Sequence, residues 1–83
     1  MKYKFLSIEF DHFGNRSYKM FKTIYDFLDT YDIVVDDEHQ ITPPDNNEFV
    51  SIAVVDLSTL EELFHISFEE GGNFDELHNY LVS

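Results

Sequence analysis

Cysteine is absent from this chain of 83 residues, which excludes disulfide bridges and thiolate metal sites. The fold must therefore be stabilised by packing alone. No apolar run approaches the roughly 18–20 residues that a membrane-spanning helix requires. Together these absences favour a cytoplasmic protein with no membrane segment.

Lysine and arginine are absent after residue 22. Residues 1–22 contain five basic and two acidic side chains, a formal charge of +3, whereas residues 23–83 contain fifteen Asp and Glu, a formal charge of −15. A small domain gains nothing in folding from so much like charge, because mutual repulsion destabilises the compact state. Direct binding of nucleic acid is not expected, since contacts to phosphates depend on Lys and Arg. The distribution predicts a negative surface that serves a basic partner.

Aromatic side chains are plentiful, at 17% of the residues within a hydrophobic total of 43%. Disordered acidic tails are poor in aromatic residues, so this composition predicts a folded chain. Two halves of a chain this short would each fail to bury a core. We therefore expect a single domain that spans residues 1–83.

Two periodicities dominate the first half of the chain. Leu6, Ile8 and Phe10 alternate with polar residues, which is typical of a strand over residues 4–10 with one side in water. After a turn, apolar residues recur every three or four positions, which predicts an amphipathic helix over residues 16–31. Its apolar stripe consists of Met20, Phe21, Ile24, Phe27, Leu28 and Tyr31.

Short strands are predicted next. The β-branched run at residues 33–35 and a return through residues 40–42 flank an acidic turn. A loop follows at residues 43–47, where proline, asparagine and aspartate gather. Residues 48–56 place apolar side chains on both faces of a strand, which indicates a central strand covered on two sides.

The last third of the chain contains one ambiguous segment, residues 57–70. A capping box at Ser58 favours a short helix to about Phe64, whereas the alternation around Phe64 favours a strand paired with residues 48–56, which we prefer. After two glycines, a final helix has an apolar face made of Phe74, Leu77 and Leu81. The sum is an α+β fold, a small antiparallel sheet with two helices in the order β-α-β-β-β-α.

The densest group of acids lies around the end of the predicted first helix. Carboxylates near a helix C-terminus oppose the helix macrodipole, and such departures from local rules are candidates for function. A solvated surface that serves only solubility would mix both signs of charge. We therefore assign a partner-binding role to Asp26, Asp29, Asp32, Asp36, Asp37 and Glu38.

Two tyrosines and a second acidic pair complete the predicted site. Tyr25 and Tyr31 lie among these acids, and tyrosine is enriched at the energetic centres of protein interfaces. Glu69 and Glu70 stand near the end of the predicted hairpin, where they would extend the negative surface.

Motifs that would indicate an enzyme are missing. No Gly-x-Ser-x-Gly nucleophile turn or phosphate-binding glycine loop occurs, and the acids fall in turns and exposed positions rather than in a pair with separated pKa values. Residues 37–48 have the length of a calcium loop, but Thr42 replaces its required glycine. The four histidines are scattered. We expect no catalytic activity, cofactor or metal site.

In size, charge, absence of cysteine and compact α+β pattern, the chain resembles phage-encoded DNA mimics, including small acidic anti-CRISPR inhibitors of Cas nucleases and anti-restriction proteins. The resemblance covers the whole chain and involves no sequence motif. It implies a basic nucleic-acid-binding partner, a host defence nuclease or nuclease complex, blocked where it engages DNA. Duplex DNA carries about one negative charge per 1.7 Å, which a carboxylate array can imitate.

Two alternatives use the same charges. An immunity protein or antitoxin would neutralise a basic nuclease toxin by the same electrostatics. A small regulatory subunit would instead oligomerise, with the basic first segment of one copy against the acidic surface of another. The sequence leaves both monomer and dimer open.

Overall fold

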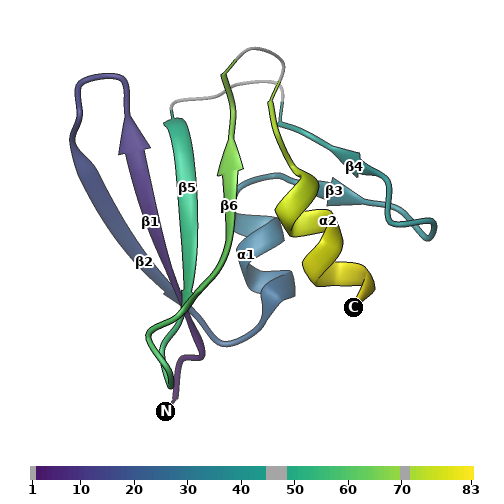
Figure 1. Cartoon of the computed structure of the whole chain (residues 1–83), viewed down its shortest axis with the longest axis horizontal. Helices are drawn as coiled ribbons and strands as arrows, with labels where there is room; N and C mark the ends of the chain where they lie inside the picture. Colours follow the sequence, from purple (N-terminus) through teal and green to yellow (C-terminus); the bar gives the residue numbers. More distant parts are fainter. Residues whose placement is uncertain (1, 45–48, 70–71) are drawn as a thin grey trace.

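Two β-hairpins form the main sheet. The computed structural model describes residues 2–44, 49–69 and 72–83. Strand β1 (Phe5–Asp11) turns back into β2 (Arg16–Phe21), and β5 (Phe49–Asp56) turns back into β6 (Glu62–Ser67). All neighbouring strands are antiparallel, in the order β2-β1-β5-β6 (Figure 1). The predicted central strand is therefore confirmed as β5, and the predicted hairpin over residues 57–70 is confirmed in place of the helix.

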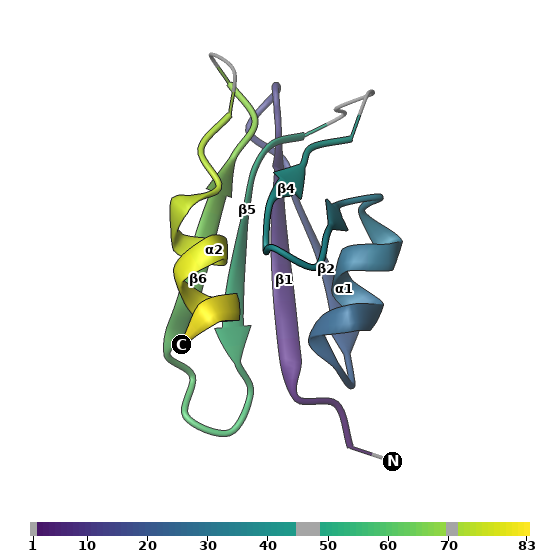
Figure 2. The same cartoon turned by 90° about the vertical axis from the view of Figure 1, so that its right-hand side faces the viewer.

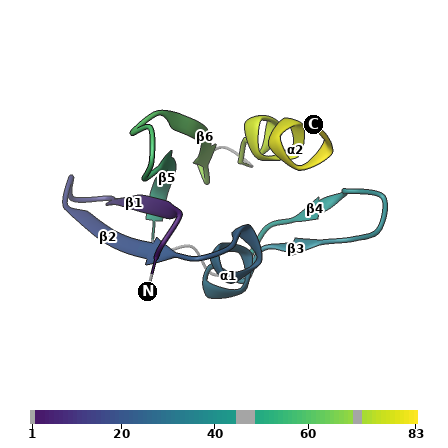
Figure 3. The same ribbon diagram turned by 90° about the horizontal axis from the view of Figure 1, so that it is seen from below.

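The remaining elements all cover one side of this sheet. They are helix α1 (Ile24–Thr30), the short hairpin β3 (Val34–Val35) and β4 (Ile41–Thr42), and helix α2 (Asp75–Val82). Figure 2 shows the hairpin between the two helices, and Figure 3 shows that no described element lies on the opposite side. The α+β class is confirmed, with more strands than predicted.

The hydrophobic core fills the space between the sheet and these covering elements. Phe27 of α1 lies at its centre, fully buried, with its ring 5.8 Å from that of Phe21 and 5.6 Å from that of Phe64. Such edge-to-face contacts add about 0.5–1.5 kcal/mol each to the burial of the rings. The core cluster consists of Phe21, Phe27, Leu28, Tyr31, Ile33, Ile52, Val54, Phe64, Ile66 and Leu77.

The prediction of a helix over residues 16–31 is wrong in its first part. Residues 16–21 form β2, because the preceding turn closes a hairpin: the Asp11 carboxylate accepts hydrogen bonds from the backbone N–H groups of Phe13 and Asn15 at 2.8 and 2.9 Å. Gly14 supplies the left-handed conformation that this turn needs, at φ 83°. The helix begins only after Thr23, whose hydroxyl caps it by accepting from the backbone N–H of Asp26.

The faces of β1 are the reverse of what its polarity suggests. The predicted alternation is confirmed, but Ser7 and Glu9 point to the covered side and are 0% and 4% exposed. Leu6, Ile8 and Phe10 lie on the side that no described element covers. The sequence pattern fixed the periodicity of the strand and not its orientation.

Candidate partner-binding groove

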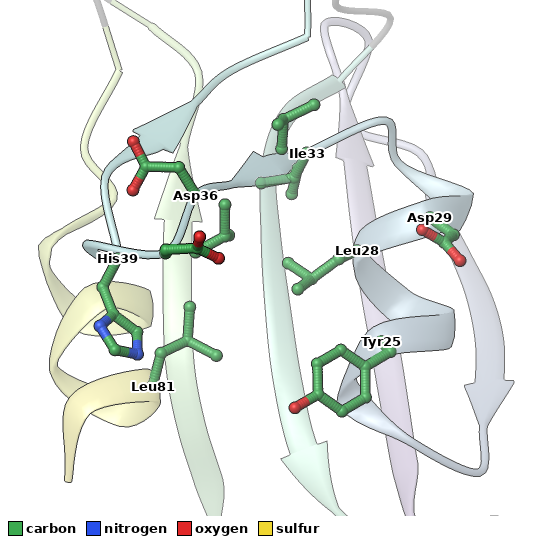
Figure 4. A pocket seen from close by; sticks show the side chains of 10 residues that line it. Tyr25, Leu28, Asp29, Ile33, Asp36, His39 and Leu81 are labelled. Carbon is green, nitrogen blue, oxygen red and sulfur yellow. The ribbon is translucent and has the colours of Figure 1, made fainter.

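A groove of ≈ 560 Å³ opens between α1, the β3–β4 hairpin and α2. In Figure 4, Tyr25 and Leu28 project from α1 towards the hairpin, while His39 and Leu81 close the other side. We call this the acidic groove, because its apolar floor is bordered by carboxylates. Its lining residues are Tyr25, Leu28, Asp29, Ile33, Val34, Val35, Asp36, Asp37, His39 and Leu81.

The hairpin wall of the groove is built by the carboxylate of Asp36. Its Oδ1 accepts hydrogen bonds from the backbone N–H groups of Glu38 and Gln40, each at 2.9 Å. His39 then adopts the left-handed conformation, with φ 62°, where glycine is the residue with least strain. The turn leaves the side chains of Asp37 and Glu38 exposed. The Asp36 side chain is thus partly structural, whereas the side chains of Asp37 and Glu38 make no hydrogen bond in the described turn.

The helix wall of the groove ends in a Schellman motif. The backbone N–H of Ile33 donates to the Leu28 carbonyl at 3.0 Å, and that of Asp32 donates to the Asp29 carbonyl at 3.3 Å. Asp32 occupies the left-handed position of this motif at φ 54°, where glycine is usual. Asp29 and Asp32 both lie at the helix C-terminus, where the macrodipole disfavours negative charge. The sequence thus has a carboxylate where glycine is usual, at Asp32, and negative charge where the macrodipole disfavours it, at Asp29 and Asp32.

Asp26 does not share this conflict. It lies in the first turn of α1, where a carboxylate is favoured, so its presumed opposition to the macrodipole is wrong. Together with Asp29 and Lys22 it borders a second, shallower hollow on the far side of α1. Figure 4 shows the Asp29 side chain pointing away from the hairpin, and Asp29 borders both hollows.

The other predicted site residues are divided. Tyr25 is 72% exposed at the groove, as an interface residue should be. The prediction that Tyr31 is a surface anchor is wrong, because the residue is 5% exposed and its ring packs against Phe27 in the core. Glu69 is exposed beyond the end of β6 and does not line the groove. Glu70 lies outside the described residues.

Buried polar groups join the C-terminal end of α1 to the sheet. The Tyr31 hydroxyl donates to Oε2 of Glu9 at 2.6 Å and lies 2.7 Å from the Ser7 hydroxyl. The ammonium group of Lys19 pairs with the same Glu9 oxygen at 3.0 Å. Burial, followed by the hydrogen bond to Glu9, raises the pKa of the Tyr31 hydroxyl well above its ordinary value. This network explains why polar residues of β1 face the core.

Among the described residues, no exposed carboxylate forms an ion pair within 4 Å, although Lys22 borders the same hollow as Asp26 and Asp29. In residues 2–44, 49–69 and 72–83, Lys19 and Glu9 form the one ion pair between side chains. Asp11 and Asp56 are occupied by their own turns. Hydrogen bonding, to the Asn15 backbone and to the Ser58 side chain respectively, lowers the pKa of each carboxyl. The rim of the acidic groove therefore keeps its charge available.

Several groove residues were not predicted. Val34 lies in β3, His39 in the turn of the same hairpin and Leu81 in α2, and only the fold brings Leu81 to the other two. One sequence signal was available: residues 11–15 and 36–40 both begin with Asp and end with an amide residue, and both form the same kind of capped turn. This likeness would have placed His39 at a left-handed turn position.

No protein-family model, curated protein or solved structure matches this chain. In the described part of the chain, no three histidine, aspartate or glutamate side chains are grouped so as to hold a metal ion. Neither helix is long and apolar enough to cross a membrane. The case for function therefore depends on the groove itself.

Proposed function

We propose that this protein is an inhibitor that occupies the nucleic-acid-binding surface of a basic protein, with the acidic groove as its contact. The proposal is carried by one observation: the exposed carboxylates of the groove rim have no basic partner within the described chain. In a protein with a formal charge of −12, this unpaired charge repels itself, and a cationic surface would relieve that repulsion.

The composition of the groove suits arginine and lysine side chains. Asp37 lines the groove and Glu38 is exposed next to it in the same turn. Their carboxylates can bind guanidinium groups by paired hydrogen bonds. The floor formed by Leu28 and Leu81 would accept the aliphatic stems that carry those charges. The exposed ring of Tyr25 offers a face on which a guanidinium can stack. A DNA-binding protein presents arginine and lysine side chains, with their aliphatic stems and their charged ends, together on its DNA-binding surface.

The fold supports this role because its acids are held on short, rigid elements. The Asp36 turn and the Schellman motif fix the backbone on both sides of the groove. Binding would therefore order few flexible groups, which lowers the entropy lost on association. By its resemblance to anti-CRISPR and anti-restriction inhibitors, the target would be a defence nuclease in the cytoplasm of a host cell.

A capture experiment with a DNA competitor tests the proposal. The protein is immobilised and exposed to a nuclease-treated lysate of its native host, and bound protein is then challenged with duplex DNA. We expect a DNA-binding protein to be retained and to be displaced by the duplex. Retention should also fall steeply between about 0.1 and 0.5 M salt, because screening weakens exposed charge pairs. A captured protein that duplex DNA cannot displace would refute DNA mimicry.

Matched charge variants separate the groove from overall charge. The groove variant carries Asp29→Asn, Asp37→Asn and Glu38→Gln, and the control carries Glu61→Gln, Glu62→Gln and Glu76→Gln. Both lose three charges from exposed positions. We expect only the groove variant to lose the partner, while its melting temperature is equal or higher. Equal loss in both variants would show that net charge alone binds, and would refute the assigned site.

A further inference from the structure

The uncovered side of the sheet exposes apolar side chains that no described element covers. Strand register places three residues of β1, Leu6, Ile8 and Phe10, beside Tyr18 and Met20 of β2 and Val55 of β5. Tyr18 and Met20 are 58% and 53% exposed, and the β1 residues are half-buried between their neighbours. We call this surface the open face. Figure 3 shows it opposite both helices.

On β1 the open face carries Leu6, Ile8 and Phe10, whereas the covered face carries the polar residues Ser7 and Glu9 besides Phe5. Ser7 and Glu9 are buried under α1 while Leu6 and Ile8 are left towards solvent. Water contact with adjacent apolar side chains is unfavourable in proportion to their exposed area, and contiguous patches of this kind mark interaction sites. Leaving these apolar side chains in water lowers the stability of the protein, and a second surface that covered this face would remove that cost.

Charge indicates what the covering surface is. By register, the charged side chains on the open face in the described strands are Arg16 and Glu62, at different edges of the sheet, with a formal sum of zero when histidine is neutral. The imidazole of His65 lies on the same face, opposite Ala53. The guanidinium of Arg16 lies 5.8 Å from the ring centre of Phe10, which holds it over this face. The unpaired carboxylates of the acidic groove lie on the other side of the sheet.

We infer that the open face binds a second copy of this chain, so that two sheets pack face to face in a symmetric dimer. Two chains of charge −12 repel each other, and this neutral apolar face lets them meet without bringing carboxylates together. A basic partner has no charge to bind here. Aligned packing of two sheets is a common architecture, with the inner side chains interleaved. Both acidic grooves would then face outward and stay accessible.

Sedimentation of the purified chain tests the dimer. We expect a monomer–dimer equilibrium that strengthens between about 0.15 and 1 M salt, because screening weakens the repulsion between two acidic chains. A dimer that dissociates in high salt would instead indicate contact between basic and acidic surfaces, and would overturn the proposal. A chain that stays monomeric in 1 M salt up to millimolar concentration would also overturn it.

Charge insertion locates the interface. Met20→Glu lies on the exposed edge strand β2, so the monomer should keep its fold, but the buried charge should weaken the dimer by at least about tenfold. Val34→Glu is the matched control, since this residue is 60% exposed beside the acidic groove. Circular dichroism verifies that both variants are folded. If Val34→Glu weakens the dimer and Met20→Glu does not, the open face is not the interface.

A measurement on the unaltered chain keeps the test independent of folding in the variants. The chain has two methionines, Met1 and Met20, so methyl labelling gives two NMR signals. We expect a soluble paramagnetic probe to broaden the Met20 signal less as protein concentration rises through the dimerisation range. The Met1 signal serves as the reference. Equal broadening of Met20 in monomer and dimer would overturn the proposal, because the methyl group would still face solvent.

Discussion

The hydroxyl of Tyr31 lies 2.6 Å from Oε2 of Glu9 and joins the end of α1 to a central strand of the sheet. Both side chains are buried, and Lys19 pairs with the same oxygen from the edge strand. A buried carboxylate is stable only when its charge is balanced and hydrogen-bonded, and here one cation and one hydroxyl do both. The helix that carries Asp26 and Asp29 is positioned by this contact.

Removing the hydroxyl should destabilise the protein. Tyr31→Phe keeps the ring in the core but leaves the Glu9 carboxylate with Lys19 alone and the Ser7 hydroxyl with only its 3.4 Å hydrogen bond to the Lys19 carbonyl. We therefore expect the free energy of unfolding to fall by about 1–3 kcal/mol in urea. Tyr25→Phe is the control, because that tyrosine is 72% exposed and should change stability little. A Tyr31→Phe protein as stable as the parent would show that the network contributes nothing to folding.

The same pair of proteins should differ in alkali. Burial raises the pKa of Tyr31 in the folded state, so above its ordinary value of about 10 the unfolded chain loses this proton while the folded chain keeps it. Folding therefore loses stability as pH rises above 10. We expect the unfolding free energy of Tyr31→Phe to fall less steeply there than that of the parent. Parallel slopes would contradict the assignment.

Asp32 predicts a stabilising substitution. At φ 54°, its backbone is strained for any residue with a Cβ atom, and its charge opposes the macrodipole of α1. We expect Asp32→Gly to raise the free energy of unfolding by about 1 kcal/mol, because glycine relieves the backbone strain. Asp32→Ala removes the charge but keeps the strain, so it should be less stable than Asp32→Gly. Equal stability of the two variants would show that the backbone is not strained.

Asp56 predicts a pH dependence in the acid range. Its Oδ1 accepts hydrogen bonds from the backbone N–H and hydroxyl of Ser58 at 2.7 and 2.6 Å, which lowers the pKa of the carboxyl. This stabilisation is present above the unfolded value of about 3.9 and is lost as pH falls through the lower folded value. We expect Asp56→Ala to melt at a lower temperature than the parent at pH 7, with a difference that shrinks below about pH 4.

Glu62→Gln is the reference for that pH series, because this exposed carboxylate makes no side-chain hydrogen bond in the described structure. A difference between Asp56→Ala and the parent that persists unchanged at pH 2 would mean that the turn is stabilised by shape and not by the ionised carboxyl.

The sequence predicted correctly those elements whose hydrophobic pattern fits a strand and does not fit a helix. The run at residues 48–56 and the alternation around Phe64 gave β5 and β6, because a helix would place their apolar residues on conflicting faces. Residues 16–21 were mistaken for helix, because Met20 and Phe21 fit both the helical stripe and a strand edge. The hydrogen bonds of the Asp11 turn reverse the chain so that residues 16–21 pair with β1 as a strand. Hydrophobic periodicity does not reveal such a turn.

The partner-binding role of the predicted site residues stays a prediction, but the structure shows which of these residues lie close together. Asp29, Asp36 and Asp37 all line the groove because a short turn joins α1 to the β3–β4 hairpin, although the Asp29 side chain points away from the hairpin. Tyr31 was misplaced because its amphipathic side chain fits an interface and a core equally well. Its burial follows from Glu9, 22 positions away, a pairing that local periodicity does not contain.

Three hairpin turns open with an aspartate whose carboxylate binds the amides of its own loop: Asp11, Asp36 and Asp56. The acids that shape the backbone are thus largely separate from those that border the groove. One can therefore neutralise the border and keep the turns, producing a molecule of the same outline with no charge to offer. Such a variant would fold like the parent but would not bind the partner. Comparing the two in cells would separate the effects of binding from the effects of expressing a protein with this fold.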